Sequence, residues 1–352
     1  MQEIELKFQI PLERVEGVRQ AIEHLSSPHG LEPLKGFVSL HAAYFDTADN
    51  ALARQKMALR VRREGDEWVQ TFKAAGEDAM TRVEDNQPRH VPNQGLPAPD
   101  LCLHPLAAQQ ALMRALPWQP AQDPRGEALG LVALYETRFE RRQARIAWPP
   151  QGEVIICIDE GEIVAGPLSE PLAELEMELA QGHPSAVLDL ARQWVRRHGL
   201  WLDVHSKAYR GTRLAQARSQ HQTPFAQPVS PETSADPKRQ LSLALDAAAG
   251  NWSEVAFQRP GWSAALLAWQ SALNLLLGQA RQRPDLHALL PASAWQATQD
   301  QARTLASFIG SFTLEQTAAH EQDPAWRRTA QALARHPDTT HWALDLLQAL
   351  KS

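Results

Sequence analysis

The sequence predicts an α+β protein in which a largely antiparallel β domain is followed by an all-α domain. Three observations lead to this fold class. Within residues 1–215, polar and apolar side chains alternate with period two in about eight stretches, with a few helical segments between them. Residues 216–238 are rich in Pro, Ser, Thr and Gln and predict a linker. Residues 239–352 are rich in Ala, Leu and Gln with amphipathic stretches, which predict helices throughout.

The strands of the first domain are predicted where the alternation is clearest. In chain order these stretches are EIELKF, FVSLHAAYFDT, ALRVRRE, EWVQTFK, TRVEDN, LVALYETRFERRQARI, EVIICIDE and LAELEMEL. Gly65 and Gly161 stand in turn-like sequences, and Gly161 is expected to close a hairpin. A helix is expected over residues 12–25, after Pro11, and another over residues 185–198, ending at Gly199.

Composition narrows the class of protein. The chain has 352 residues, is 43% hydrophobic and carries a formal net charge of −6, so it can bury a core and is a poor candidate for general nucleic-acid binding. Its two cysteines lack the spacing of a metal site, which predicts reduced thiols. Because neither a secretory leader nor an apolar membrane span is evident, a cytoplasmic protein without nucleic-acid or membrane partners is expected. The oligomeric state is not indicated.

Charged side chains share one face of strand after strand. In the opening strand, alternation places Glu3, Glu5 and Lys7 on one face and hydrocarbon on the other. An ordinary strand with one face in water would also show this pattern. The same arrangement recurs in later strands with Arg60 and Arg62, with Arg82 and Glu84, with Glu136, Arg138, Glu140 and Arg142, and with Glu174, Glu176 and Glu178.

A closed sheet gives these charges a function. If the sheet forms a barrel and helices cover its apolar outside, the charged face is enclosed. Buried charges are tolerated when they are paired or bind ions. Lysines and arginines suit a chain of phosphates, and carboxylates suit Mg²⁺ or Mn²⁺, which bridge to phosphate.

The order of these motifs resembles the CYTH superfamily, the triphosphate tunnel metalloenzymes. Glu3-Ile4-Glu5-Leu6-Lys7 is similar to the family's ExExK signature, and the resemblance covers about residues 1–210. It implies an eight-stranded antiparallel β tunnel with flanking helices that binds triphosphate inside. The later residues that follow in the family's order are Arg60, Arg62, Lys73, Arg82, Glu84, Arg138, Asp159, Glu174, Glu176 and Lys207.

The resemblance also implies roles for these residues. The implied metal ligands are Glu3, Glu5, Asp159, Glu174 and Glu176. The implied triphosphate ligands are Lys7, Arg60, Arg62, Lys73, Arg82, Arg138 and Lys207. Glu3, Glu5, Lys7 and Arg138 are the implied catalytic group. The roles of Glu178, Arg142 and Arg210 stay open, and Arg141 and Arg145, which have the opposite parity to Arg138, are expected to be solvated.

The implied activity is hydrolysis of inorganic triphosphate to diphosphate and phosphate, dependent on Mg²⁺ or Mn²⁺ and proceeding by direct attack of water. The partner is therefore a small-molecule triphosphate. Two alternatives on the same fold are an adenylyl cyclase of the class IV type and a thiamine triphosphatase. A third alternative is a module that binds polyphosphate without turnover.

The helical domain resembles CHAD, a family of histidine-rich, basic domains associated with polyphosphate. This chain departs from that pattern, because residues 239–352 have a net charge near zero and their histidines are not clustered. Two interpretations are open: a polyphosphate-binding domain, and a helical scaffold or interaction module.

Overall fold

The structure, a computed structural model, describes residues 2–25, 30–32, 37–65, 67–75, 81–89, 95–310 and 314–351. Within these ranges, none of the helices combines the length and the apolar character that crossing a membrane requires.

The β part is one antiparallel sheet that closes on itself. Its strands follow the order β1-β6-β5-β4-β3-β7-β8-β9, and β9 pairs with β1, so eight strands form a ring. Among the described residues there are ten strands rather than the eight expected, because β2 adds to β7 and β10 adds to β1. The strands are β1 (Gln2–Gln9), β2 (Gly30–Glu32), β3 (Val38–Asp46), β4 (Met57–Glu64), β5 (Glu67–Ala75), β6 (Thr81–Arg89), β7 (Val132–Trp148), β8 (Gly152–Ala165), β9 (Leu168–Gly182) and β10 (Trp201–Leu202). The predicted tunnel fold is confirmed.

Both predicted helices of the first domain are present. Residues 12–25 form a 3₁₀ turn followed by α1, and α4 ends at Gly199, whose φ of 66° supplies the left-handed cap that glycine favours. Helices α2, α3 and α5 were not predicted, because their apolar spacing is short or interrupted by polar residues. The helices of this part are α1 (Val15–Leu25), α2 (Ala51–Arg54), α3 (Leu106–Ala115), α4 (Ser185–His198) and α5 (Lys207–Ser219).

The expectation that Gly161 closes a hairpin is wrong. Gly161 lies inside β8, opposite Phe139 of β7, and the chain turns at Gly166, with φ 61°. A Cβ at Gly161 would overlap the backbone of β7 at Arg138 and Phe139. The glycine is therefore used for close strand approach and not for a turn.

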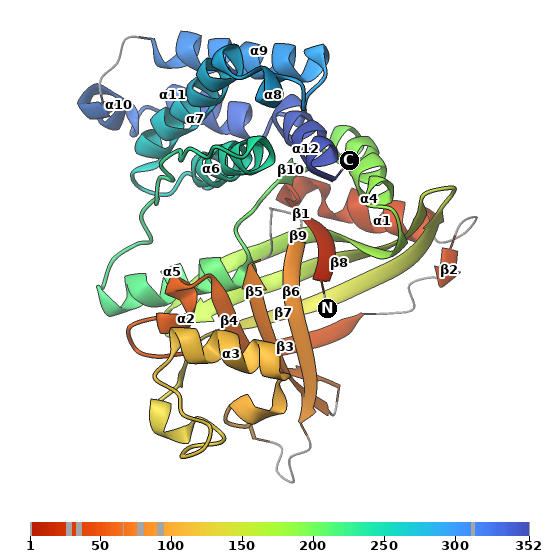
Figure 1. Cartoon of the computed structure of the whole chain (residues 1–352), viewed down its shortest axis with the longest axis vertical. Coiled ribbons are helices and arrows are strands. Elements are labelled where there is room, and N and C mark those ends of the chain that lie inside the picture. Colours follow the sequence, from red (N-terminus) through yellow and green to blue (C-terminus); the bar gives the residue numbers. More distant parts are fainter. Residues whose placement is uncertain are drawn as a thin grey trace.

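The second part of the chain is all helical, as predicted. Its helices are α6 (Pro237–Phe257), α7 (Trp262–Gln282), α8 (Pro284–His287), α9 (Ala292–Ile309), α10 (Leu314–His320), α11 (Pro324–Ala334) and α12 (Pro337–Lys351). In Figure 1 these helices lie together at one side of the strand ring, and α12 lies beside α4. The segment expected to be a linker, 216–238, contains the last residues of α5 and the first of α6.

One hydrophobic cluster joins the two parts. Leu6 and Phe8 of β1 belong to the same buried cluster as Trp194 of α4, Trp252 of α6 and Trp342 of α12. The outer face of β1 is therefore covered by α4 and by the helical part together.

A second cluster lies on the inner side of the ring. Tyr44 of β3 and Tyr135 and Phe139 of β7 pack against Leu214 and Ala215 of α5. Helix α5 thus occupies one end of the enclosed space. The face of β7 that carries Tyr135 and Phe139 points inward, whereas the sequence had placed it outside.

Candidate active site in the strand ring

Strand register collects the charged side chains on the inner face. Lys7 of β1 lies opposite Glu176 of β9, and Asp159 of β8 lies opposite both Glu174 of β9 and Arg141 of β7. Directly opposed residues of antiparallel strands project to the same side and touch. Four neighbouring strands therefore contribute to one charged cluster.

Three of the predicted metal ligands surround a lysine. The Lys207 Nζ lies 2.8 Å from Asp159 Oδ2, 2.6 Å from Glu174 Oε2 and 2.7 Å from Glu176 Oε1. Lys207 is the first residue of α5, and Ser206 caps the helix by accepting a hydrogen bond from the Tyr209 amide. The three carboxylates have oxygen atoms within 4.8 Å of one another, a spacing that suits a cation. The cation that they hold in this structure is the Lys207 ammonium.

Lys7 is bound in the same way at the neighbouring position. Its Nζ lies 3.4 Å from Glu174 Oε1 and 3.2 Å from Asp203 Oδ2, and it donates to the carbonyl of His205. Gln9 Nε2 donates to Glu174 Oε1 and Asp203 Oδ2, at 2.9 and 2.8 Å. Lys7 is therefore fixed by two carboxylates and a backbone oxygen.

The electrostatics of this cluster stabilise the charged forms of Lys207, Glu176 and Asp203. Burial works to lower the pKa of Lys207, but the three surrounding carboxylates outweigh it and hold that pKa well above its usual value. Burial works to raise the pKa of Glu176, yet Lys207 and Arg141 hold it well below its usual range. In the same way Lys7 outweighs burial and lowers the pKa of Asp203. Each charge is thus stabilised by its neighbours.

The structure separates Arg138 from this cluster and brings Arg141 into it. The Arg141 guanidinium binds Asp159 through two hydrogen bonds, of 2.7 and 2.6 Å, and also binds Glu176. The expectation that Arg141 is solvated is therefore wrong. Arg138 projects to the opposite side of β7, where its side chain is 53% exposed and pairs with Glu136.

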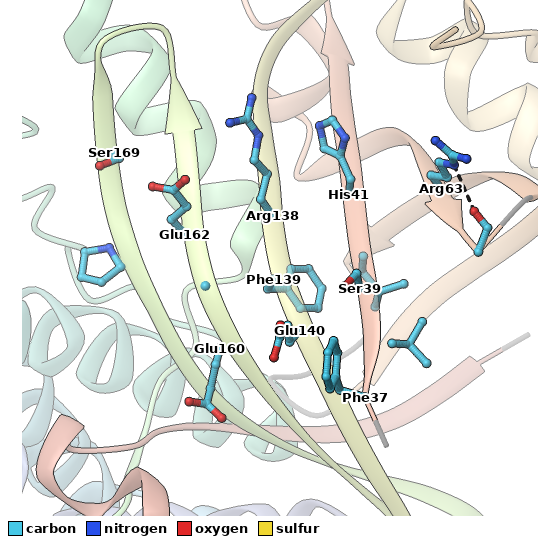
Figure 2. Close-up of a pocket in the computed structure, with 15 residues that line it drawn as sticks. Phe37, Ser39, His41, Arg63, Arg138, Phe139, Glu140, Glu160, Glu162 and Ser169 are labelled. Carbon is cyan, nitrogen blue, oxygen red and sulfur yellow. Dashed lines mark hydrogen bonds between the residues drawn. The ribbon is translucent and has the colours of Figure 1, made fainter. Parts of the chain in front are cut away.

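The surroundings of Arg138 are an outer hollow of about 1150 Å³. Figure 2 shows Arg138 there between Glu162 of β8 and His41 of β3, its register neighbours. Arg142 also lies on this side, with its guanidinium 5.3 Å from the ring centre of Phe37. The parity assigned to β7 from sequence was reversed, because both of its faces combine apolar and charged residues.

A second group of basic side chains lines the strands across the ring. Arg60 and Arg62 of β4 have side chains that are 11% and 14% exposed, and they lie near Arg141. Lys73 of β5 pairs with Glu84 of β6, which also lies 3.7 Å from Arg60. These predicted phosphate ligands are brought together. The side chains of Glu3 and Arg82 lie outside the described residues, although their backbones pair between β1 and β6.

Glu5 and Glu178 form a carboxylate pair of a different kind. They are register partners on β1 and β9, so their Cβ atoms are about 5 Å apart by strand geometry. Burial, followed by the negative charge of Glu5, raises the pKa of Glu178. Among the described side chains neither residue forms an ion pair or a hydrogen bond, in contrast with the carboxylates around Lys207.

Three residues of the deep cluster were not assigned from the sequence. Arg141 alternates with Tyr135 and Phe139 on the same face of β7, so recognising that this face points inward would have identified it. Asp203 lies in irregular chain after β10, and nothing in its local sequence marks it as a partner of Lys7. Arg210, left open before, binds Glu174 from one turn along α5.

This geometry agrees with the comparison with known proteins. The CYTH domain model matches residues 1–211, which is more than half of the chain, and the chain belongs to this family. An inorganic triphosphatase of Haemophilus influenzae is 28% identical over 172 residues, which are 48% of this chain and 44% of that relative. The chain thus spans less than half the length of this curated relative.

Two solved structures are also similar to part of this chain. A Pyrococcus horikoshii protein is 18% identical with a TM-score of 0.35, over 59% of this chain and 96% of that one. A Hippeastrum protein described as having a dominant triphosphatase activity is 19% identical with a TM-score of 0.36, over 60% of this chain and 96% of that one.

Proposed function

We propose that this protein hydrolyses inorganic triphosphate to diphosphate and phosphate inside the strand ring, with Mg²⁺ or Mn²⁺. The observation that carries the proposal is the arrangement of charge on the inner face. The half-buried carboxylates Glu5 and Glu178, which form no ion pair with another described side chain, share the enclosed space with Arg60, Arg62 and Lys73.

The carboxylate pair fits a divalent cation. Two opposed carboxylates of which one has a raised pKa repel each other, and a bound cation relieves this repulsion. We assign the metal to Glu5 and Glu178, with Glu3 of the same strand. Asp159, Glu174 and Glu176 fit this role less well, since they already neutralise Lys207 and Arg141. When bound, the cation would neutralise phosphate charge and orient an attacking water.

The chain's own basic residues would bind the substrate. Arg60 and Arg62 present guanidinium groups suited to phosphate oxygens. Arg82 is kept as a ligand from the sequence prediction alone, since its side chain lies outside the described residues. Lys73 adds an ammonium from β5. Lys7 and Lys207 bind substrate by exchanging part of their carboxylate contacts for phosphate oxygens. Arg138 lies on the outer face and is not part of this proposal.

The substrate class follows from what the enclosed space offers. Among the described residues, the aromatic side chains Tyr44, Tyr135 and Phe139 on the inner face pack against Leu214 and Ala215 of α5, which supports a substrate without a nucleobase or thiazolium ring. The Haemophilus influenzae relative, an inorganic triphosphatase, supports the same choice.

The test is phosphate release by the purified protein with Mg²⁺ and then Mn²⁺. The substrates are triphosphate, ATP, thiamine triphosphate, diphosphate and long-chain polyphosphate. We expect metal-dependent cleavage of triphosphate above all others, and its loss in Glu5→Gln with an unchanged circular dichroism spectrum. Release of cyclic AMP from ATP, or tight triphosphate binding without turnover, would contradict the proposal.

A further inference from the structure

A series of ion pairs connects the tunnel with the helical part. Arg210 of α5 binds Glu174 Oε1 through Nη1, at 2.7 Å, and Glu170 Oε1 through Nε, at 2.6 Å. Arg259, which follows α6, binds the same Glu170 Oε1 at 3.1 Å and Glu254 Oε2 at 3.3 Å. Positive and negative groups therefore alternate from the tunnel carboxylate Glu174 to Glu254 of the helical part.

The group at the helical end of this series, Glu254, is fully buried. The Glu254 side chain is 0% exposed and also binds Arg213 of α5. It accepts a further hydrogen bond from the Tyr209 hydroxyl, at 3.2 Å. Buried charges are screened far less than exposed ones, so the loss of one charge in this series alters the electrostatic interactions of the neighbouring charges.

Glu170 joins the two halves of this series, because it pairs with both arginines. It shares Arg210 with Glu174 and shares Arg259 with Glu254. Glu174 also binds Lys7 and Lys207. The closer the positive charge of Arg210 lies to Glu174, the less strongly this carboxylate attracts the two lysines.

We propose that Arg259 and Glu254 of the helical part control how strongly Glu174 binds the tunnel lysines Lys7 and Lys207. The two residues act as positioning residues for Lys7 and Lys207, and neither contacts substrate. The inference rests on the proposed function in one respect, namely that these lysines bind triphosphate.

Opposite effects follow for the two positions. In Arg259→Gln, Glu170 loses one arginine and draws Arg210 toward itself, so Glu174 holds the lysines more tightly. We expect the KM for triphosphate to rise about fivefold with kcat within about twofold. In Glu254→Gln, Arg259 turns fully to Glu170 and releases Arg210 to Glu174, so the lysines are held less tightly and KM falls.

KM changes of opposite sign distinguish this effect from a general loss of structure, because a loosened fold raises KM in both variants. Asp345→Asn is the matched control, since it removes a carboxylate of α12 that pairs with Arg192 of α4 at 3.1 Å, outside the ring. It breaks a contact between the same two parts, and we expect an unchanged KM. Equal shifts in all three variants, or no shift in Arg259→Gln, would overturn the proposal.

A crystal structure of Arg259→Gln provides a readout that does not depend on activity. We expect the distance from Arg210 Nη1 to Glu174 Oε1 to exceed 3.5 Å. An Arg210 that keeps both contacts would overturn the proposal even in an active enzyme. If the parent protein does not cleave triphosphate, the proposed function fails, and the position of Arg210 still decides this inference. If Glu254→Gln does not fold, Arg259→Gln decides it alone.

Discussion

The carboxylates on the inner face fall into two groups with different electrostatics. Glu174 and Glu176 have lowered pKa values, because lysine and arginine outweigh the effect of burial. Glu178, one pleat further along β9, has a raised pKa from burial and from Glu5. The first group fixes basic side chains, and Glu178, on the same strand, is the residue that we propose as the ligand of a cation.

Glu178→Gln tests this division. Because the substitution removes one of the two opposed carboxylates, we expect kcat for triphosphate to fall at least about 100-fold, on the scale of losing an electrostatic catalytic group. Mn²⁺ binding, measured by calorimetry, should weaken in parallel. The control is Glu162→Gln, on the outer face of β8, which should keep kcat within about twofold. Normal Mn²⁺ binding by Glu178→Gln would show that the metal lies elsewhere.

Asp203 gives a prediction about pH. Its pKa is lowered in the folded protein, since Lys7 outweighs burial. The unfolded chain takes up a proton near the usual pKa of about 3.9, while the folded protein does not. Asp203 therefore stabilises the protein above that pH, and this stabilisation is lost as the pH falls toward the folded pKa. In Asp203→Asn, urea unfolding between pH 5 and pH 2 should show a shallower loss of stability than in the parent. A parent-like slope would contradict the assignment.

At the scale of elements, α5 connects the deep cluster with the ring wall. Its first residue is Lys207, and the Tyr135 hydroxyl of β7 donates to the Ala208 carbonyl at 2.9 Å. Gly211 lies against the ring of Tyr135, so closely that a Cβ would overlap it. This close approach positions Lys207 and Arg210 among the carboxylates.

Gly211→Ala should therefore displace α5. We expect the free energy of unfolding to fall by about 2 kcal/mol, typical of an overpacked core, and turnover to fall with it. Gly278→Ala is the matched control in α7, where a Cβ meets nothing within 4 Å. It should raise stability by up to about 1 kcal/mol through helix propensity. Chemical denaturation of both variants is the measurement, and a neutral Gly211→Ala would show that α5 is not held by this contact.

At the scale of the whole molecule, the two parts share a core. Trp252 of α6 is fully buried, donates from Nε1 to the Leu202 carbonyl of β10 at 2.9 Å, and packs against Trp269 and Trp342. The hydrophobic cluster that contains it extends to Leu6 of β1. Ring and helices should therefore unfold as one cooperative unit.

Trp252→Ala tests this cooperativity. Truncation of a buried tryptophan typically costs about 3–5 kcal/mol, through lost burial and the cavity left behind. Hydrogen exchange followed by mass spectrometry should show faster exchange in β1 and β9 as well as in α6. Faster exchange confined to the helices would mean that the ring is stable without them.

Prediction from sequence succeeded where a local pattern carries the information. Alternation in EIELKF and LAELEMEL located β1 and β9 and placed Glu5, Lys7, Glu174 and Glu176 on the inner face. It failed on β7, where Tyr135 and Phe139 are buried inside the ring and Ala144 and Ile146 are buried outside it. Alternation reports which residues share a face, and it does not report which face is enclosed.

The sequence by itself determined the fold class and most of the charged residues that share a strand face, because side-chain period and residue type are local properties. The closed antiparallel ring was implied only by the resemblance to the CYTH family. The tertiary structure decided which charges meet. Lys207 lies among the predicted metal ligands, Arg141 replaces Arg138 in the cluster, and Glu254 reaches the tunnel through Arg259. Ion pairs between residues far apart in the chain depend on register and helix docking, and these are fixed only when the whole core is packed.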